Sequence, residues 1–293
     1  MIQTPYANYY HTQDGEKLYY CTNFSDVSKI RQPVLVFNYG LICNNGHWSK
    51  QIPYFDQIKY PILIHNYRGH FNSTGSQHIE KCTFKQFSLD LKEILDELAI
   101  KSTIMLGHSM GVNVTLEFAK SFPEMVEKMI LISGTVFSPK DIMFDTNLTD
   151  LLIPYAKLFK DKFPNIFQKF WAHGGKNTLI QKMIMNGGFN KSQVPMEFVE
   201  IYLNRIGQLD PELFFQLLDE MGSHDIITHL ENILQPALLI SGDSDKVIPN
   251  YLQFAIKDRL KNSEIYIIKN GSHVPQVDFP DIINERISHF INA

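Results

Sequence analysis

Three side chains that could together perform acyl transfer lie far apart in this 293-residue sequence: Ser109, Asp245 and His273. A serine hydroxyl is a weak nucleophile until a base takes its proton, and imidazole is the base suited to neutral pH. A carboxylate beside the imidazole fixes its tautomer and stabilises its protonated form. The three residue types therefore predict nucleophilic catalysis, provided that the fold brings them together.

Ser109 lies in the motif Gly107-His108-Ser109-Met110-Gly111. The apolar run 103–106 before it is typical of a strand, and residues 112–121 after it are compatible with a helix. A serine at a tight strand-to-helix turn needs small neighbours two positions away on each side, because the backbone folds back there. The serine oxygen would then stand at the edge of a sheet, above a helix N-terminus that favours negative charge. The same pattern also suits a turn that only packs a helix on a strand. A catalytic role for Ser109 therefore requires a base and an acid elsewhere in the chain.

The candidate base and acid also follow predicted strands. His273 comes after the apolar run 264–268, and Asp245 comes after the run 237–241. Functional groups gather at the carboxyl ends of strands in open parallel sheets. A serine, an acid and a histidine at three strand ends, in that order, form a much stronger signal than any one motif.

Other residues compete for these roles. Asp243 lies two residues before Asp245, and acids in such a loop often cap the following helix; we favour Asp245. Asp141, just beyond the apolar run 129–132, is a more distant candidate for the acid. His108 adjoins the serine, and we expect it to pack beneath the turn rather than to act as the base.

Short apolar runs alternate with helix-like segments over much of the chain. A tyrosine-rich hairpin is predicted over residues 6–24, around an Asp-Gly turn. Continuous apolar runs typical of buried strands occur at 34–37, 61–65, 103–106, 129–132, 237–241 and 264–268. Helical segments are predicted at 47–58, 83–98, 112–121, 249–261 and 280–291. This alternation predicts an α/β fold with a parallel sheet covered on both faces.

The alternation stops at about residue 135. The stretch that follows has only helical spacing, at 148–160, 164–173, 178–186, 195–206 and 211–221. We therefore predict a core of residues 1–135 and 236–293, with a helical cap inserted at 136–235. Most aromatic residues of the cap should be ordinary core, but its inner face could instead line an apolar pocket. The candidates for substrate contact are Phe170, Trp171 and Met185.

Composition excludes several classes of protein. Apolar residues make up 44% and charged residues 20% of the chain, as in ordinary globular proteins. The net charge is −4 and no basic stripe stands out, so nucleic acid is not an expected partner. No stretch approaches 18 uninterrupted apolar residues, so no transmembrane span is expected.

The cysteines and the N-terminal residues favour a cytoplasmic location. Three scattered cysteines suit a reducing compartment, and no basic patch followed by an apolar run marks a secretory signal. We expect no metal and no cofactor, because the chain has neither zinc-type Cys/His spacing nor a glycine-rich phosphate loop. The sequence makes no prediction of the oligomeric state.

These features together resemble the α/β-hydrolase superfamily, in its branch with a helical cap after the sixth strand. The resemblance rests on the motif around Ser109, on Gly271-Ser272-His273, and on three further stretches: Asn66-Tyr67-Arg68-Gly69-His70, Gly242-Asp243-Ser244-Asp245-Lys246-Val247-Ile248-Pro249 and Pro236-Ala237-Leu238-Leu239-Ile240. It implies a mostly parallel, eight-stranded sheet flanked by helices. It also places the acid three residues after a glycine, which is Asp245 here.

The same resemblance implies an oxyanion hole made of two backbone N–H groups, those of Leu41 and Met110. The family usually has His-Gly at the end of its third strand, where this chain has Tyr39-Gly40. Backbone donors survive a change of side chain, so the hole can persist. The placement of its loop is the open question, because the usual histidine helps to hold it.

The expected reaction is cleavage of a carboxylic ester through an acyl-enzyme intermediate, on a small molecule with an apolar acyl or aromatic part. Lactone opening, thioester hydrolysis, carbon–carbon bond hydrolysis and perhydrolysis use the same three side chains, and fold alone does not separate them. A low-turnover ligand-binding or receptor protein on a hydrolase scaffold is the alternative of another class, and Tyr39 motivates it.

Overall fold

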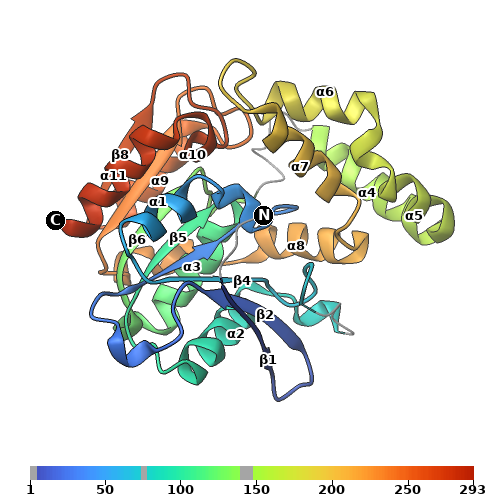
Figure 1. Cartoon of the computed structure of the whole chain (residues 1–293). Helices are drawn as coiled ribbons and strands as arrows, with labels where there is room; N and C mark the ends of the chain where they lie inside the picture. Colours follow the sequence, from blue (N-terminus) through green and yellow to red (C-terminus); the bar gives the residue numbers. More distant parts are fainter. Residues whose placement is uncertain (1–4, 74–77, 139–147) are drawn as a thin grey trace.

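The computed structural model describes residues 5–73, 78–138 and 148–293. Its centre is an eight-stranded sheet with the strand order β1-β2-β4-β3-β5-β6-β7-β8 (Figure 1). The strands are β1 (Tyr6–His11), β2 (Lys17–Thr22), β3 (Val34–Asn38), β4 (Ile62–His65), β5 (Thr103–His108), β6 (Val126–Ile132), β7 (Ala237–Gly242) and β8 (Ser263–Ile268). β2 runs antiparallel to both of its neighbours, and the pairs from β4 to β8 are parallel. The predicted eight-stranded, mostly parallel sheet is confirmed.

The central strands β3 to β7 are mostly apolar and buried, because both faces of the sheet are covered. Along β5, Met105 packs into one core, whereas Ile104 and Leu106 pack into the other, as the two-residue period of a strand requires. The helices of the core are α1 (Gln51–Gln57), α2 (Phe84–Glu97), α3 (Met110–Ser121), α9 (Asn250–Arg259), α10 (Pro275–Asp278) and α11 (Pro280–Asn292). Side chains of α2, α3 and α9 fill the first core, and those of α1 and α11 fill the second. Burial on both faces leaves the strand ends as the places where loops can carry chemistry.

The cap is inserted between β6 and β7. Its helices are α4 (Leu148–Lys162), α5 (Pro164–Ala172), α6 (Thr178–Gly187), α7 (Met196–Ile206) and α8 (Pro211–Ser223). Figure 1 shows α4, α5, α6 and α7 projecting to one side of the sheet, with α8 returning toward the core. Over the described residues, none of the helices is both long enough and apolar enough to cross a membrane.

A buried arginine in the loop that follows β4 binds two other elements, the helix α2 and the β1–β2 turn. Arg68 has no exposed surface and donates from Nε and Nη2 to the two carboxylate oxygens of Asp90 in α2, over 2.7 and 2.5 Å. Its Nη1 donates to Asp14, in the β1–β2 turn, over 3.0 Å. The fork geometry of arginine matches this paired arrangement, which a lysine could not reproduce. The interaction fixes the hairpin and α2 against the loop.

We expect Arg68→Met to lower the free energy of unfolding by about 3–5 kcal/mol, because the buried Asp90 carboxylate then loses its main partner. Urea denaturation followed by circular dichroism measures the change. The matched control is Lys29→Met, which breaks the exposed Lys29–Asp26 pair and should cost less than about 1 kcal/mol. Equal losses in the two variants would contradict the structural role of Arg68.

Candidate active site

Ser109 forms the junction between β5 and α3 in a conformation that few residues adopt. Its backbone has φ 54° and ψ −123°, and its N–H donates to the carbonyl of Ile132 over 2.9 Å. A Cβ atom added to Gly107 would lie 2.6 Å from Gly111 O, and one added to Gly111 would lie 2.3 Å from Asn38 O. The two glycines therefore give the turn the room that its tight fold requires. This is the strained strand-to-helix turn that displays a serine oxygen at the edge of a sheet.

The structure brings Ser109, His273 and Asp245 together. His273 Nε2 lies 3.1 Å from Ser109 Oγ, and His273 Nδ1 lies 2.9 Å from Asp245 Oδ2. An ionised carboxylate only accepts hydrogen bonds, so Nδ1 carries the proton and Nε2 is left free to accept the serine proton. The His273 side chain is 12% exposed and the Asp245 side chain is fully buried, so the aspartate is shielded from water while the imidazole stays accessible.

Asp243 does not take the place of Asp245. The second carboxylate oxygen of Asp245 accepts from the N–H groups of Val247 and Ile248, over 2.8 and 2.9 Å, which orients the first oxygen toward the histidine. Asp243 is exposed and accepts from the N–H of Asn270 instead. Asp141 lies outside the described residues.

His108 lies beneath the turn, as its neighbourhood in the sequence suggested. Its Nε2 donates to the carbonyl oxygen of His273 over 2.9 Å, and its ring lies 5.1 Å from the His273 ring. Burial, together with His273 and His47, keeps the pKa of His108 well below its ordinary value. Burial also lowers the pKa of His47 to about 3. Both rings are therefore neutral supports, and no motif in the sequence indicates the role of His47.

The loop after β3 approaches Ser109 closely. A Cβ atom on Gly40 would lie only 2.9 Å from Ser109 Cβ, so the Gly40–Leu41 backbone passes directly beside the serine. Met110 begins α3 and is fully buried. The first N–H groups of a helix have no acceptor within the helix, so the Met110 amide is available to a ligand. Leu41 is far from Ser109 in the sequence, but the backbone before it passes beside the serine, and Met110 follows the serine directly.

Two tyrosines hold this loop through a pair of hydrogen bonds, both donated by Tyr67. The Tyr67 hydroxyl donates to the carbonyl oxygen of Tyr39, and the Tyr67 N–H donates to the Tyr39 hydroxyl, each over 3.1 Å. Their rings lie 4.5 Å apart, and Tyr67 stacks on Phe87 of α2 at 4.7 Å. Tyr39 therefore has a supporting role of its own at the position where the family usually has a histidine. It is half of a tyrosine clasp, the pair Tyr39 and Tyr67, that ties the β3 loop to the β4 loop.

The cap residues singled out in the sequence lie in three different environments. Trp171 packs in a cluster with Phe167 and Phe215, and its Nε1 donates to the carbonyl of Leu209 over 2.8 Å. Met185 packs beside a cluster that includes Val274, the neighbour of His273. Phe170 is 57% exposed on the outside of α5. Helical spacing identified the apolar positions of the cap, but it did not tell inner from outer faces.

Asp278 supports the histidine loop and was not singled out in the sequence. Its Oδ2 accepts from the Ser272 N–H over 2.7 Å, directly beside His273. Burial, with a contribution from the Asp245 carboxylate, raises the pKa of Asp278 to about 6. Its only signal in the sequence is its place five residues after the histidine, within the unpredicted short helix α10.

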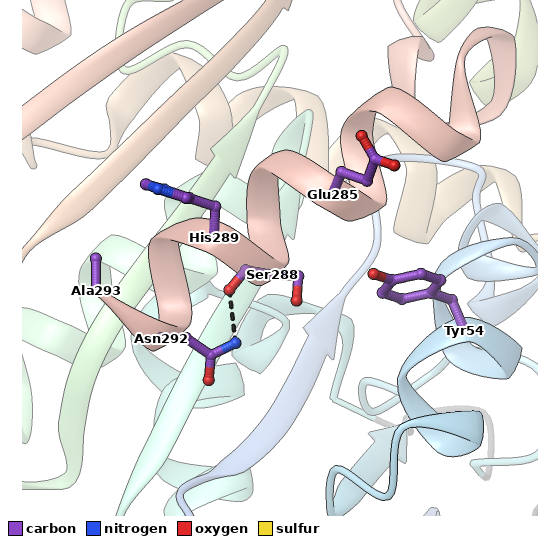
Figure 2. Close-up of a pocket in the computed structure, with 6 residues that line it drawn as sticks. All are labelled: Tyr54, Glu285, Ser288, His289, Asn292 and Ala293. Atoms are coloured by element: carbon purple, nitrogen blue, oxygen red, sulfur yellow. Dashed lines mark hydrogen bonds between the residues drawn. The ribbon is translucent and has the colours of Figure 1, made fainter.

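A separate surface cavity of about 330 Å³ lies between α1 and α11. Figure 2 shows its lining residues, which are Tyr54, Glu285, Ser288, His289, Asn292 and Ala293. None of the three strand-end side chains belongs to it, so it is not the candidate active site. Among residues 5–73, 78–138 and 148–293, no group of three or more His, Cys, Asp or Glu side chains is arranged to hold a metal ion.

The chain belongs to the α/β hydrolase fold family, since the model of that family, described as "alpha/beta hydrolase fold", matches residues 33–280. The sheet order, the inserted cap and the turn at Ser109 all agree with this assignment. One fold of this kind can carry many different functions, so the fold does not by itself select the substrate.

Individual proteins similar to this chain include hydrolases of different kinds. The chain is 24% identical over 289 residues to the uncharacterized hydrolase YugF of Bacillus subtilis, with 96% of each protein covered. It is 24% identical over 259 residues to the pimeloyl-[acyl-carrier protein] methyl ester esterase of Nitrosospira multiformis, covering 88% of this chain and 94% of the relative. The solved enol-lactonase from Burkholderia xenovorans LB400 matches with a TM-score of 0.76 at 16% identity, covering 98% of this chain and 100% of that chain. Likeness to a structure at such identity establishes the fold alone.

The raised pKa of Asp278 predicts a pH dependence of stability. Its pKa is about 6 in the folded protein and 3.8 in the unfolded chain, so the folded state binds more protons between these values. The contribution of Asp278 is therefore most favourable below pH ~4 and is lost as pH rises through ~6. Relative to wild type, Asp278→Asn should gain at most about 3 kcal/mol between pH 4 and 7, by urea denaturation. Asp281→Asn, an exposed acid nearby, is the control. A difference between wild type and Asp278→Asn that does not change with pH would contradict the assignment.

Proposed function

We propose that this chain is a serine hydrolase that cleaves carboxylic esters through an acyl-enzyme intermediate. Ser109 Oγ attacks the ester carbonyl while His273 Nε2 takes its proton. His273 then returns the proton to the leaving alcohol, and Asp245 orients the imidazole and stabilises its charge. A water molecule, activated by the same histidine, releases the acid. The observation that carries the proposal is the relay of 3.1 and 2.9 Å contacts that starts at a serine held in a left-handed backbone.

The oxyanion of the tetrahedral intermediate would be bound by the N–H groups of Leu41 and Met110. Support comes from the close approach of the Gly40 backbone to Ser109 and from the position of Met110 at the start of α3. Donors fixed before the reaction stabilise the developing charge without reorganising. The tyrosine clasp would serve this role by holding the Tyr39 carbonyl, two residues before the Leu41 N–H.

An ester with an apolar acyl or aromatic part fits the surroundings of the site. Leu41 packs against a cluster built from cap residues, which includes Phe167, Phe214 and Trp171. The relative from Nitrosospira multiformis, named as a methyl ester esterase, is consistent with ester chemistry on this scaffold. We assign the cap to residues 136–235 and propose that it supplies this apolar wall. We also propose a cytoplasmic location, which agrees with Cys21, Cys43 and Cys82 being buried thiols.

Hydrolysis of short- and medium-chain nitrophenyl esters tests the proposed function. Ser109→Ala should lower kcat/KM by at least about 10⁴-fold, because the nucleophile is lost. Asp245→Asn should lower it by roughly 10³–10⁴-fold, since the amide favours the wrong tautomer of the histidine. Asp243→Asn is the matched control in the same loop and should retain activity within about threefold, because surface changes away from the reacting groups have small effects. Full activity in Ser109→Ala, or equal losses in the two aspartate variants, would contradict the proposal.

If the tyrosine clasp positions the oxyanion hole, its loss should weaken stabilisation of the transition state without weakening substrate binding. Tyr67→Phe removes the hydroxyl that holds the Tyr39 carbonyl, and we expect kcat to fall about 10–100-fold, less than the effect of losing an oxyanion donor outright. KM should stay within about twofold, and the affinity for a trifluoromethyl ketone inhibitor should fall in parallel with kcat. Tyr60→Phe is the control, because it removes a mostly buried hydroxyl, bonded to Asn292, far from the loop. A rise in KM with an unchanged kcat would show that the clasp does not act on the oxyanion.

A further inference from the structure

The outer surface of α4 and α5 carries an unusual concentration of exposed apolar side chains. Six of them are between 41% and 65% exposed, and we call them the outer cap face: Tyr155, Leu158, Phe159, Phe163, Ile166 and Phe170. Single exposed apolar residues are ordinary, but a contiguous group on a soluble fold marks an interaction surface. Figure 1 shows that α4 and α5 lie at the end of the molecule farthest from the C-terminal helix.

Helical geometry makes the outer cap face continuous. Tyr155, Leu158 and Phe159 are three and four residues apart, and Phe163, Ile166 and Phe170 repeat that spacing across the junction into α5. The rings of Phe159 and Phe163 lie 5.5 Å apart, which joins the two helices. The face is therefore one apolar surface rather than two separate patches.

The charges on these helices are opposite in sign to those of the protein as a whole. Residues 148–172, which span α4 and α5, hold four lysines and two aspartates, in a chain whose net charge is −4. Lys157 and Lys160 reach across to acids of α8, namely Asp219 and Glu212. Lys162 and Lys169 are exposed and lie on the same two helices as the apolar residues. An exposed aromatic and aliphatic surface with lysines among it is the composition of a helix that lies in a lipid interface.

The inner sides of the same helices lead to the candidate active site. Ile153 and Ala156 of α4 and Trp171 of α5 pack in the cluster that also contacts Leu41, the residue after Gly40. Two helices thus separate the exposed outer cap face from the loop beside Ser109. A molecule held at the outer face would lie next to the part of the cap that borders the site.

We propose that the outer cap face docks on the surface of an anionic phospholipid bilayer. Phosphate headgroups complement Lys162 and Lys169, and the acyl boundary accepts the aromatic and aliphatic side chains. A second copy of this chain fits less well, because a symmetric contact would bring the same lysines together. Docking of this kind would give the site access to apolar substrates dissolved in the bilayer. The docking itself does not depend on the proposed ester hydrolysis.

Sedimentation of the full-length protein with vesicles tests the docking. Wild type should pellet with phosphatidylcholine vesicles that contain 30% phosphatidylglycerol, a composition chosen for the assay. The double variant Leu158→Glu/Ile166→Glu should bind at least tenfold more weakly. Leu234→Glu is the matched control, because Leu234 is 66% exposed but lies outside helices α4 and α5, and it should bind within twofold of wild type.

Two further variants complete the experiment: one that reverses the charge of two lysines and one that lacks the serine nucleophile. Lys162→Glu/Lys169→Glu should lose at least tenfold in binding to the anionic vesicles, since each lysine near such a surface contributes about fivefold. Ser109→Ala should bind as wild type does, so failure of the esterase proposal and failure of docking give different results. The proposal is overturned if wild type does not pellet with the anionic vesicles, or if Leu234→Glu binds as weakly as the double variant. It is also overturned if sedimentation equilibrium shows a dimer that the double variant dissociates.

Discussion

The left-handed backbone of Ser109 is the constraint on which the rest of the site depends. A residue with a side chain holds such a conformation at a cost of roughly 1–3 kcal/mol, and it persists only where its surroundings leave no alternative. Here the surroundings are a bond from the Ser109 N–H to the carbonyl of Ile132, and the close packing of Gly111 against the backbone of Asn38. Because α3 must start at this point and in this direction, the serine oxygen can stand only at the edge of the sheet.

The loops that meet the serine are each secured by their own hydrogen bonds. Asp245 is held by the N–H groups that follow it, and the His273 loop is held by the bond between Ser272 and Asp278. The loop after β3 is held by the tyrosine clasp. Each loop is therefore held by bonds besides those that join the three side chains, so the relay of hydrogen bonds needs little further ordering. Preorganisation of this kind is what separates a catalytic arrangement from a chance meeting of three side chains.

Much of the fold could be predicted from the sequence, because buried strands and amphipathic helices leave regular patterns. The apolar run before Gly107 predicted β5, and the block of helical spacing after residue 135 predicted the inserted cap. The positions of Ser109, Asp245 and His273 at strand ends followed from the same patterns. Their meeting in space depended on the parallel order of the sheet, which the alternation of strands and helices implied.

The contacts that the sequence did not reveal are those between loops. Tyr39 looked like the loss of a supporting histidine, and only the fold shows that Tyr67 is its partner. Asp278 and His47 carry no pattern of their own, since their roles arise from what lies across the site. In the cap, periodicity marked Phe170 as apolar but could not show that it faces outward. Such features depend on tertiary contacts, for which local spacing has no signature.

Covalent labelling with a fluorophosphonate, followed by peptide mass spectrometry, tests whether His273 activates the hydroxyl of Ser109. Such a probe reacts with a serine only when the hydroxyl is activated by a base and the resulting anionic oxygen is stabilised. We expect one adduct per chain, located on Ser109, which forms in wild type and is lost when His273 is replaced by alanine. An adduct on another residue, or labelling of Ser109 at the same rate without the imidazole, would contradict it.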